Sequence, residues 1–221
     1  MIKSLKLNKK IELVDRGLGA EIFSGIVNGI GALLALTAMI LVIVFASIAG
    51  GKGLIICSVF YGVILFLTYL ASCLYHSLAY NDGKRVFRFL TITLVQFLFS
   101  ACIMIICYKL FRDKFVMLFG ISFALSTISA FFNVIDFEKF RYVRIISFLI
   151  QTVMALLVIY KSLVLLPSIA FGLLIVSVIT FILGFIFHIY GYQLSYLNSI
   201  GHIFVLTGNA FLFFTILLFV I

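Results

Sequence analysis

The chain alternates between long apolar runs and short polar segments. The apolar runs cover residues 22–49, 54–78, 87–108, 115–132, 143–160, 163–188 and 198–221. Apolar residues are continuous within each run and do not alternate at every second position, which predicts helices and not strands. A helix needs about 20 apolar residues to cross the hydrocarbon core of a membrane, where the backbone must satisfy its own hydrogen bonds. The pattern therefore predicts an all-α, polytopic membrane protein with a bundle of seven transmembrane helices.

A polar, basic tail precedes the first run, so we expect two parts: a tail at 1–21 and a single seven-helix domain at 22–221. A signal peptide is the alternative for the first run, since Ser47-Ile48-Ala49 faintly resembles a cleavage site. The run is, however, far longer than the roughly 7–15 apolar residues of a signal peptide. The sixth helix is expected to start near Leu163, with Pro167 in its first turn, where proline is tolerated.

Composition and charge agree with this reading. Hydrophobic residues make up 65% of the chain and charged residues only 10%, against about 25% charged in soluble domains. The net charge of +9 comes from short loops between apolar runs, so a nucleic-acid partner is not predicted. Placing the N-terminus in the cytoplasm puts 11 of the 16 Lys and Arg residues inside. We expect a multi-pass cell-membrane protein with a cytoplasmic N-terminus and an outer C-terminus, in a bacterial plasma membrane.

Three histidines are the candidates for chemistry. His76 ends the second run, His188 ends the sixth and His202 lies one turn into the seventh. The predicted topology places all three at the cytoplasmic end of the bundle. Histidine is the commonest metal ligand, and a zinc site usually takes three protein ligands and a water. The three form a metal cluster if their helices are neighbours; the alternative is three ordinary interfacial residues.

Further polar residues are expected at the same depth. Ser72 precedes His76 by one helical turn and Asn198 precedes His202 by four residues, so each pair shares a helix face. The other candidates for lining a site are Glu21, Asn28 and Thr91. The alternative role for each is a helix cap or an interhelical hydrogen bond. No soluble-enzyme motif is present, and no acidic residue lies deep in a run, which argues against an ion-coupled transporter.

Three segments together resemble the hemolysin III branch of the progestin and adipoQ receptor family. They are Glu21-Ile-Phe-Ser-Gly-Ile-Val-Asn28-Gly-Ile-Gly-Ala, then Ser72-Cys-Leu-Tyr-His76-Ser with the following Gly83-Lys84-Arg85-Val-Phe-Arg88, and Gly201-His202-Ile-Phe-Val-Leu-Thr-Gly. The resemblance covers nearly the whole chain in order and in helix count. The Ser-x-x-x-His and Gly-Lys-Arg stretch is its most specific part.

The resemblance implies a seven-helix fold with an intramembrane zinc ion held by three histidines. In that family a serine on the second helix and an aspartate at the start of the third hold a zinc-bound water. Here His76 and His202 match two of the histidines, and Ser72 matches the serine. Three positions depart from the pattern. Asn198 stands in place of the first histidine of the seventh helix, Thr91 in place of the aspartate and Asn28 in place of a histidine of the first helix. An amide is a poorer zinc ligand than imidazole; His188 could supply a third nitrogen if the sixth helix turns it inward.

We therefore expect a hemolysin III-like membrane protein with a degenerate zinc site, acting in membrane-lipid homeostasis, sensing or cytolysis. Its expected partners are membrane lipids, with a lipid ligand in the bundle. The alternatives are an active zinc-dependent hydrolase of lipid amide bonds and a small transporter or channel. We expect His76 and His202 to face one interior cavity, with Asn198 lining it and Thr91 at its rim.

Overall fold

The computed structural model describes residues 11–13, 16–162, 164–191 and 194–221, apart from the side chain of Ser195. Within these residues every regular element is helical, which confirms the predicted all-α class. The α-helices are α1 (Leu18–Ala49), α2 (Lys52–Ser77), α3 (Asp82–Leu110), α4 (Phe115–Ile135), α5 (Arg141–Ser162), α6 (Ser168–Tyr190) and α7 (Ser195–Thr215). A 3-10 turn, Arg112–Lys114, precedes α4, and a π-helical turn, Ile216–Val220, extends α7.

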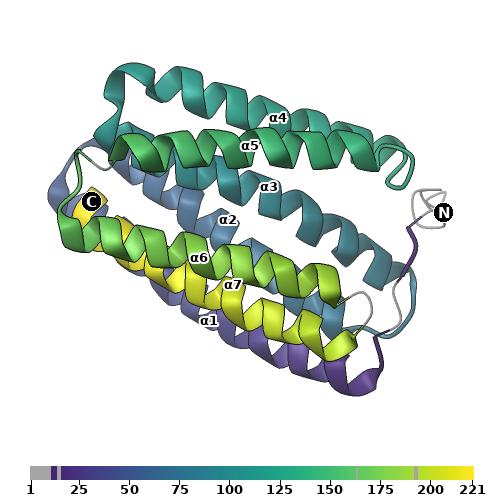
Figure 1. Ribbon diagram of the computed structural model, residues 1–221. Helices are drawn as coiled ribbons and strands as arrows, with labels where there is room; N and C mark the ends of the chain where they lie inside the picture. Colours follow the sequence, from purple (N-terminus) through teal and green to yellow (C-terminus); the bar gives the residue numbers. More distant parts are fainter. Residues whose placement is uncertain (1–10, 14–15, 163, 192–193) are drawn as a thin grey trace.

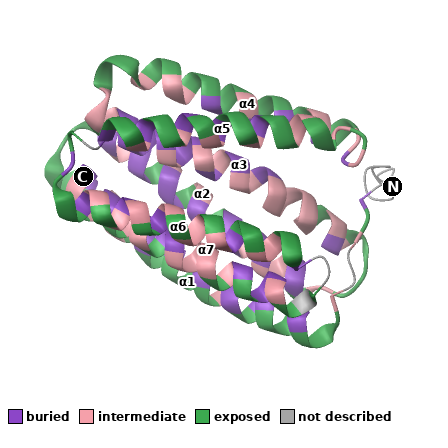
Figure 2. Ribbon diagram, in the orientation of Figure 1, coloured by how far each residue is buried: buried purple, intermediate pink, exposed green. Residues whose placement is uncertain are grey.

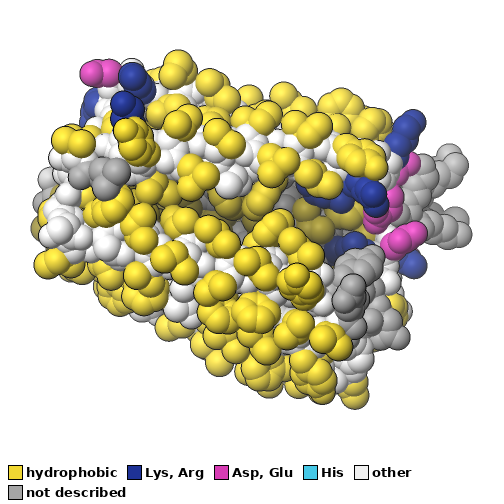
Figure 3. All heavy atoms as spheres, viewed as in Figure 1, with side chains coloured by type: hydrophobic (Ala, Val, Ile, Leu, Met, Phe, Trp, Pro, Cys, Tyr) yellow, Lys and Arg dark blue, Asp and Glu magenta, His cyan; other side chains and the backbone are white. Residues whose placement is uncertain are grey.

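The seven α-helices form one elongated bundle, and the start of α1 lies at the opposite end from the last residues of the chain (Figure 1). In the described part of the chain, seven helices are long and apolar enough to cross a membrane, as predicted. The face in Figure 3 is covered by hydrophobic side chains, and its charged side chains gather at the two ends of the bundle. This distribution is that of a membrane-spanning protein, because charges at mid-membrane depth are costly.

The helices form two groups that meet at α2 and α3. On one side α1 packs against α2 and α7, and α6 packs against α7. On the other side α4 and α5 lie on α3. Buried residues concentrate where helices face one another, while α4, α5 and α6 expose most of their outer surface (Figure 2). The exposed surface is rich in Ile, Leu, Val and Phe, as expected of helices in contact with lipid.

Close packing of α1 on α2 depends on two glycines. A Cβ atom on Gly31 would lie 2.5 Å from the ring of Tyr69, and one on Gly62 would lie 2.6 Å from the side chain of Met39. Small residues allow helices in membranes to approach closely. This contact brings the start of α1 beside the end of α2, where His76 lies.

Several helices begin a few residues before the predicted runs, α1 at Leu18 instead of residue 22 among them, and two of the differing starts have a local cause. The third helix begins at Asp82, five residues before the predicted 87, because the Asn81 side chain caps it by accepting a hydrogen bond from the Lys84 backbone N–H at 2.9 Å. The predicted start of the sixth helix at Leu163 lies outside the described residues. Residues 164–166 are not helical, and α6 begins directly after Pro167, which disfavours a helical conformation in the residue before it.

Candidate functional site: an intramembrane histidine centre

The three histidines come together at the end of the bundle where α1 begins. His76 lies in the last turn of α2, His188 in the last turn of α6 and His202 in the second turn of α7. The ring centroids of His76 and His202 are 4.9 Å apart, and those of His188 and His202 are 4.7 Å apart. Five helices, α1, α2, α3, α6 and α7, contribute to the surrounding contacts. We call the following residues the histidine centre: Glu21, His76, Lys84, His188, Asn198 and His202.

The contacts of His76 fix where its ring protons lie. Its Nδ1 atom is 2.9 Å from Oε2 of Glu21, and its Nε2 atom is 3.1 Å from Nε2 of His202. A carboxylate can only accept hydrogen bonds, so Nδ1 of His76 carries a proton and donates it. A neutral His76 therefore presents a bare lone pair on Nε2 to His202.

The orientation of the Asn198 amide decides where the ring protons of His202 and His188 lie. The amide Nδ2 of Asn198, which can only donate, lies 3.3 Å from Nε2 of His202. The amide Oδ1 lies 2.9 Å from Nδ1 of His188 and accepts its hydrogen bond. With the Asn198 amide in this orientation, both Nε2 atoms of the neutral His76–His202 pair are acceptors at 3.1 Å; with the amide reversed, Nε2 of His202 carries a proton and donates it to His76. Two facing lone pairs repel unless a cation, either a proton or a metal ion, lies between them.

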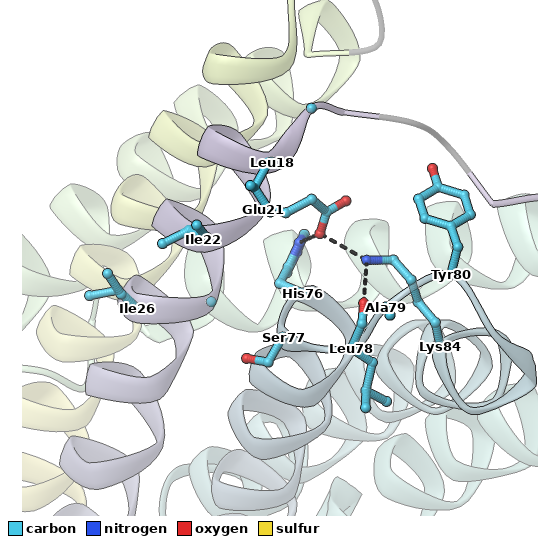
Figure 4. Close-up of a pocket in the computed structure, with 12 residues that line it drawn as sticks. Leu18, Glu21, Ile22, Ile26, His76, Ser77, Leu78, Ala79, Tyr80 and Lys84 are labelled. Atoms are coloured by element: carbon cyan, nitrogen blue, oxygen red, sulfur yellow. Dashed lines mark hydrogen bonds and ion pairs between the residues drawn. The ribbon is translucent and has the colours of Figure 1, made fainter.

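A buried ion pair supports His76 from the side of α1 and α3. Lys84 is 1% exposed, and its Nζ donates to Oε2 of Glu21 at 3.1 Å and to the backbone oxygen of Leu78 at 3.2 Å. Figure 4 shows the Glu21 carboxylate between His76 and Lys84. Lys84 also lies 5.0 Å from the centroid of the Tyr75 ring, a cation–π contact. Glu21 therefore holds a fixed negative charge against His76, as an outer carboxylate does behind a metal-binding histidine.

Lys84 is the residue that the sequence analysis missed, since it counted this side chain as a loop charge. The signal that could have found it is Asn81, a good helix cap three residues earlier. A helix that starts at Asp82 places Lys84 in its first turn, from which the side chain reaches the end of α2.

The other predicted site residues divide between the centre and its surroundings. Glu21 and Asn198 contact the histidines directly, and Ser72 is buried one turn before His76. Asn28 is buried but forms its hydrogen bond within α1, donating to the backbone oxygen of Ser24 at 2.8 Å. Thr91 is half-buried, and its hydroxyl has no hydrogen-bond partner among the described residues. The structure thus assembles most, but not all, of the predicted set.

The residues present fit a zinc ion only in part. Two imidazole nitrogens on one tetrahedral zinc, each at about 2.0–2.1 Å, lie about 3.3–3.4 Å apart, and the observed separation of 3.1 Å is close to this. In the part of the chain that the structure describes, however, no group of three or more His, Cys, Asp or Glu side chains is arranged to hold a metal ion. The centre therefore offers two converging nitrogens, with Asn198 and Thr91 at the positions where the family resemblance implies a histidine and an aspartate. No hydrolytic step follows from this set.

Comparison with known proteins identifies the family. The family model described as "Haemolysin-III related" matches residues 17–213. The chain is 26% identical over 219 residues to "Hemolysin-3" of Bacillus cereus, covering 97% of this chain and 98% of that protein. It is 25% identical over 198 residues to "Hemolysin-3 homolog" of Bacillus subtilis (strain 168), covering 89% and 92%. No solved structure matches the chain. The family match includes every helix that contributes to the histidine centre, and this multi-pass membrane protein belongs to the haemolysin-III related family.

Proposed function

We propose that this chain acts in membrane-lipid homeostasis or sensing through a zinc ion held between His76 and His202. The observation that supports this is the pair of Nε2 atoms 3.1 Å apart, both of which are acceptors when the Asn198 amide donates to His202. One cation between them removes the repulsion of two lone pairs. Imidazole is a preferred zinc ligand, and Glu21 holds His76 in the tautomer that such binding needs.

A binding or sensing role suits this centre better than hydrolysis. A hydrolytic zinc needs an open coordination position and a group that takes the proton of the attacking water. Thr91 replaces the carboxylate of the family pattern, and Asn198 replaces one of its histidines. Zinc would supply Lewis acidity when bound, but among the described residues of the histidine centre the carboxylate, Glu21, is already paired with His76 and Lys84.

Metal analysis tests the proposal directly. The protein is purified in detergent, supplied with zinc and washed, and its zinc content is measured. We expect bound zinc in the unaltered chain and its loss in His76→Ala and in His202→Ala. Thr207→Ala, five residues after His202 on α7, is the matched control and should keep the metal. An unaltered chain that holds no zinc would overturn the proposed centre.

The lipid role needs a separate measurement in cells. Membrane lipid composition is compared among cells that lack the chain, cells that produce it and cells that produce His76→Ala. We expect the unaltered chain alone to restore the composition. Equal restoration by His76→Ala would show that the lipid role does not depend on the histidine centre.

Cytolysis is the second candidate, favoured by the full-length similarity to a protein named "Hemolysin-3". The test is erythrocyte lysis by the purified chain, with an unrelated seven-helix membrane protein at the same dose as control. Lysis equal to that of the control would reject this candidate.

A further inference from the structure

A pocket of about 700 Å³ lies beside the histidine centre, between the first turns of α1 and the end of α2 with the following connection. One wall of the pocket is apolar: Leu18, Ile22 and Ile26 lie along the same side of α1 (Figure 4). The other residues that line it are Gly17, Glu21, Gly25, His76, Ser77, Leu78, Ala79, Tyr80 and Lys84. The pocket is therefore amphipathic, with a hydrocarbon-like wall next to a buried ion pair.

The apolar wall opens toward lipid. Ile22 and Ile26 are 53% and 57% exposed on the outside of a membrane-spanning helix. The polar part of the pocket lies at the helix ends, where a bilayer has its head groups. An occupant that matches both parts is a single membrane lipid, with an acyl chain along α1 and its head group at the ion pair.

The polar end of the pocket leaves one strong acceptor unused. Glu21 is 8% exposed and makes both of its hydrogen bonds, to His76 and to Lys84, through Oε2. Its other oxygen, Oε1, is buried and has no hydrogen-bond partner in the described part of the chain. A buried carboxylate oxygen without a donor costs free energy, and a head group that supplies an N–H would satisfy it.

We propose that this pocket binds the head group of phosphatidylethanolamine, an inference that goes beyond the zinc centre and does not require it. The ammonium group donates to Oε1 of Glu21 in a charge-assisted hydrogen bond, and the phosphate lies on the Lys84 side. The unused acceptor selects this lipid. Oε1 of Glu21 needs a donor, which the ammonium group of phosphoethanolamine supplies, whereas phosphatidylglycerol brings a phosphate and no cation to the carboxylate. Phosphatidylcholine is also zwitterionic, but its trimethylated nitrogen has no N–H to donate.

Native mass spectrometry of the full chain in detergent tests the proposal. The probes are phosphatidylethanolamine, phosphatidylcholine and phosphatidylglycerol with identical acyl chains, added one at a time and in competition. We expect phosphatidylethanolamine to be retained about tenfold more than phosphatidylcholine, the ratio that corresponds to one net hydrogen bond. Equal retention of the two, or preferential retention of phosphatidylglycerol, would overturn the proposal.

Two substitutions locate the binding. Ile26→Trp fills the apolar wall, and Ile30→Trp is its matched control, one turn further along the same exposed face of α1 and outside the pocket. Glu21→Gln keeps the shape of the side chain and an acceptor oxygen but removes the charge. We expect both Ile26→Trp and Glu21→Gln to lose the preference for phosphatidylethanolamine, and Ile30→Trp to keep it. A preference unchanged by both pocket substitutions would overturn the assignment.

Zinc content measured on the same samples separates the two proposals. Ile26 does not contact the histidines, so Ile26→Trp should lose the lipid preference and keep its metal. A chain without zinc that still prefers phosphatidylethanolamine would contradict the zinc proposal and support the lipid site.

Discussion

The histidine centre and a second polar cluster, on α3, α4 and α5, bury polar side chains in opposite ways. We call the second set the serine–glutamine cluster: Gln96, Ser100, Ser122, Ser126 and Gln151. The hydroxyl of Ser100 lies 2.9 Å from those of Ser122 and Ser126, and Nε2 of Gln151 donates to Ser126 at 2.7 Å and to the Ser122 backbone oxygen at 2.9 Å. All five residues are at most 1% exposed.

The difference lies in what each set leaves unsatisfied. The serine–glutamine cluster is neutral and bonds mostly to itself, so only the amide oxygens of its two glutamines lack partners among the described residues. The histidine centre holds a buried ion pair, two lone pairs that face each other and a free carboxylate oxygen. A closed neutral cluster joins helices in a membrane, whereas ionisable groups in a membrane usually serve function. The contrast predicts that substitutions in the serine–glutamine cluster reduce stability alone, whereas substitutions in the histidine centre reduce both stability and binding.

The largest expected effect is on the ion pair. Glu21→Leu leaves the buried charge of Lys84 without its partner, and we expect a loss of about 3–5 kcal/mol in the free energy of unfolding. The double variant Glu21→Leu with Lys84→Met replaces the pair by apolar groups and should recover most of that loss. Thermal unfolding in detergent, followed by circular dichroism, measures both. Equal losses in the single and double variants would show that the two charges are not coupled.

A second histidine on α7 should strengthen the proposed metal binding. Asn198→His creates a His-x-x-x-His pair with His202, which adds an imidazole nitrogen to those that His76 and His202 offer the metal. We expect zinc affinity to rise by about tenfold or more, a change of about 1.4 kcal/mol. Competition with a zinc-binding dye measures the affinity, and Asn198→Ala is the control that removes the amide without adding a ligand. An affinity that is the same in Asn198→His and Asn198→Ala would contradict a shared site.

A substitution in the serine–glutamine cluster should lower stability without changing zinc binding. Gln151→Leu removes the two hydrogen bonds from Nε2 to α4, and interhelical hydrogen bonds in membranes are worth about 0.6 kcal/mol, with a maximum of about 1.7. We expect a loss in that range with unchanged zinc content, measured by thermal unfolding and metal analysis. Val153→Leu, on the lipid-facing side of α5, is the control. A loss of zinc in Gln151→Leu would erase the distinction between the two clusters.

The smallest expected effect concerns a single neutral bond near the histidine centre. Ser24 of α1 and Ser199 of α7 join through their hydroxyls at 2.8 Å. Ser24→Ala should cost about 0.6 kcal/mol or less, with zinc and lipid binding retained. Thermal unfolding, metal analysis and native mass spectrometry measure these three properties. A large loss of zinc would mean that the position of α7 against α1, and not the ligands alone, controls the metal.

The fold was predictable because lipid imposes it. The seven runs were visible as continuous apolar stretches, and their order and number are those of the observed helices. Two of the errors in helix starts trace to single residues. Asn81 capped α3 earlier than the hydrophobic pattern indicated, and Pro167 ended the non-helical connection before α6. Local backbone chemistry at these two positions outweighed hydrophobicity.

The candidate site was predictable as a set of residues but not as a network. Helix register placed His76, His202 and Asn198 at one end of the bundle, and the family resemblance singled out the same residues. The pairing of Glu21 with Lys84 was not visible, because those residues are 63 positions apart and each had a simpler role as a cap or a loop charge. The contact between His188 and Asn198 likewise depends on how α6 turns against α7.

The sequence by itself determined that the chain crosses a membrane seven times, because continuous apolar runs of this length have no stable alternative in water. It also determined which end of the bundle carries the histidines, since each helix reverses the direction of the chain. The tertiary structure alone decided which side chains meet. The close approach of α1 and α2 at their glycines, and of α6 and α7, sets distances of a few ångströms that no spacing along the chain contains.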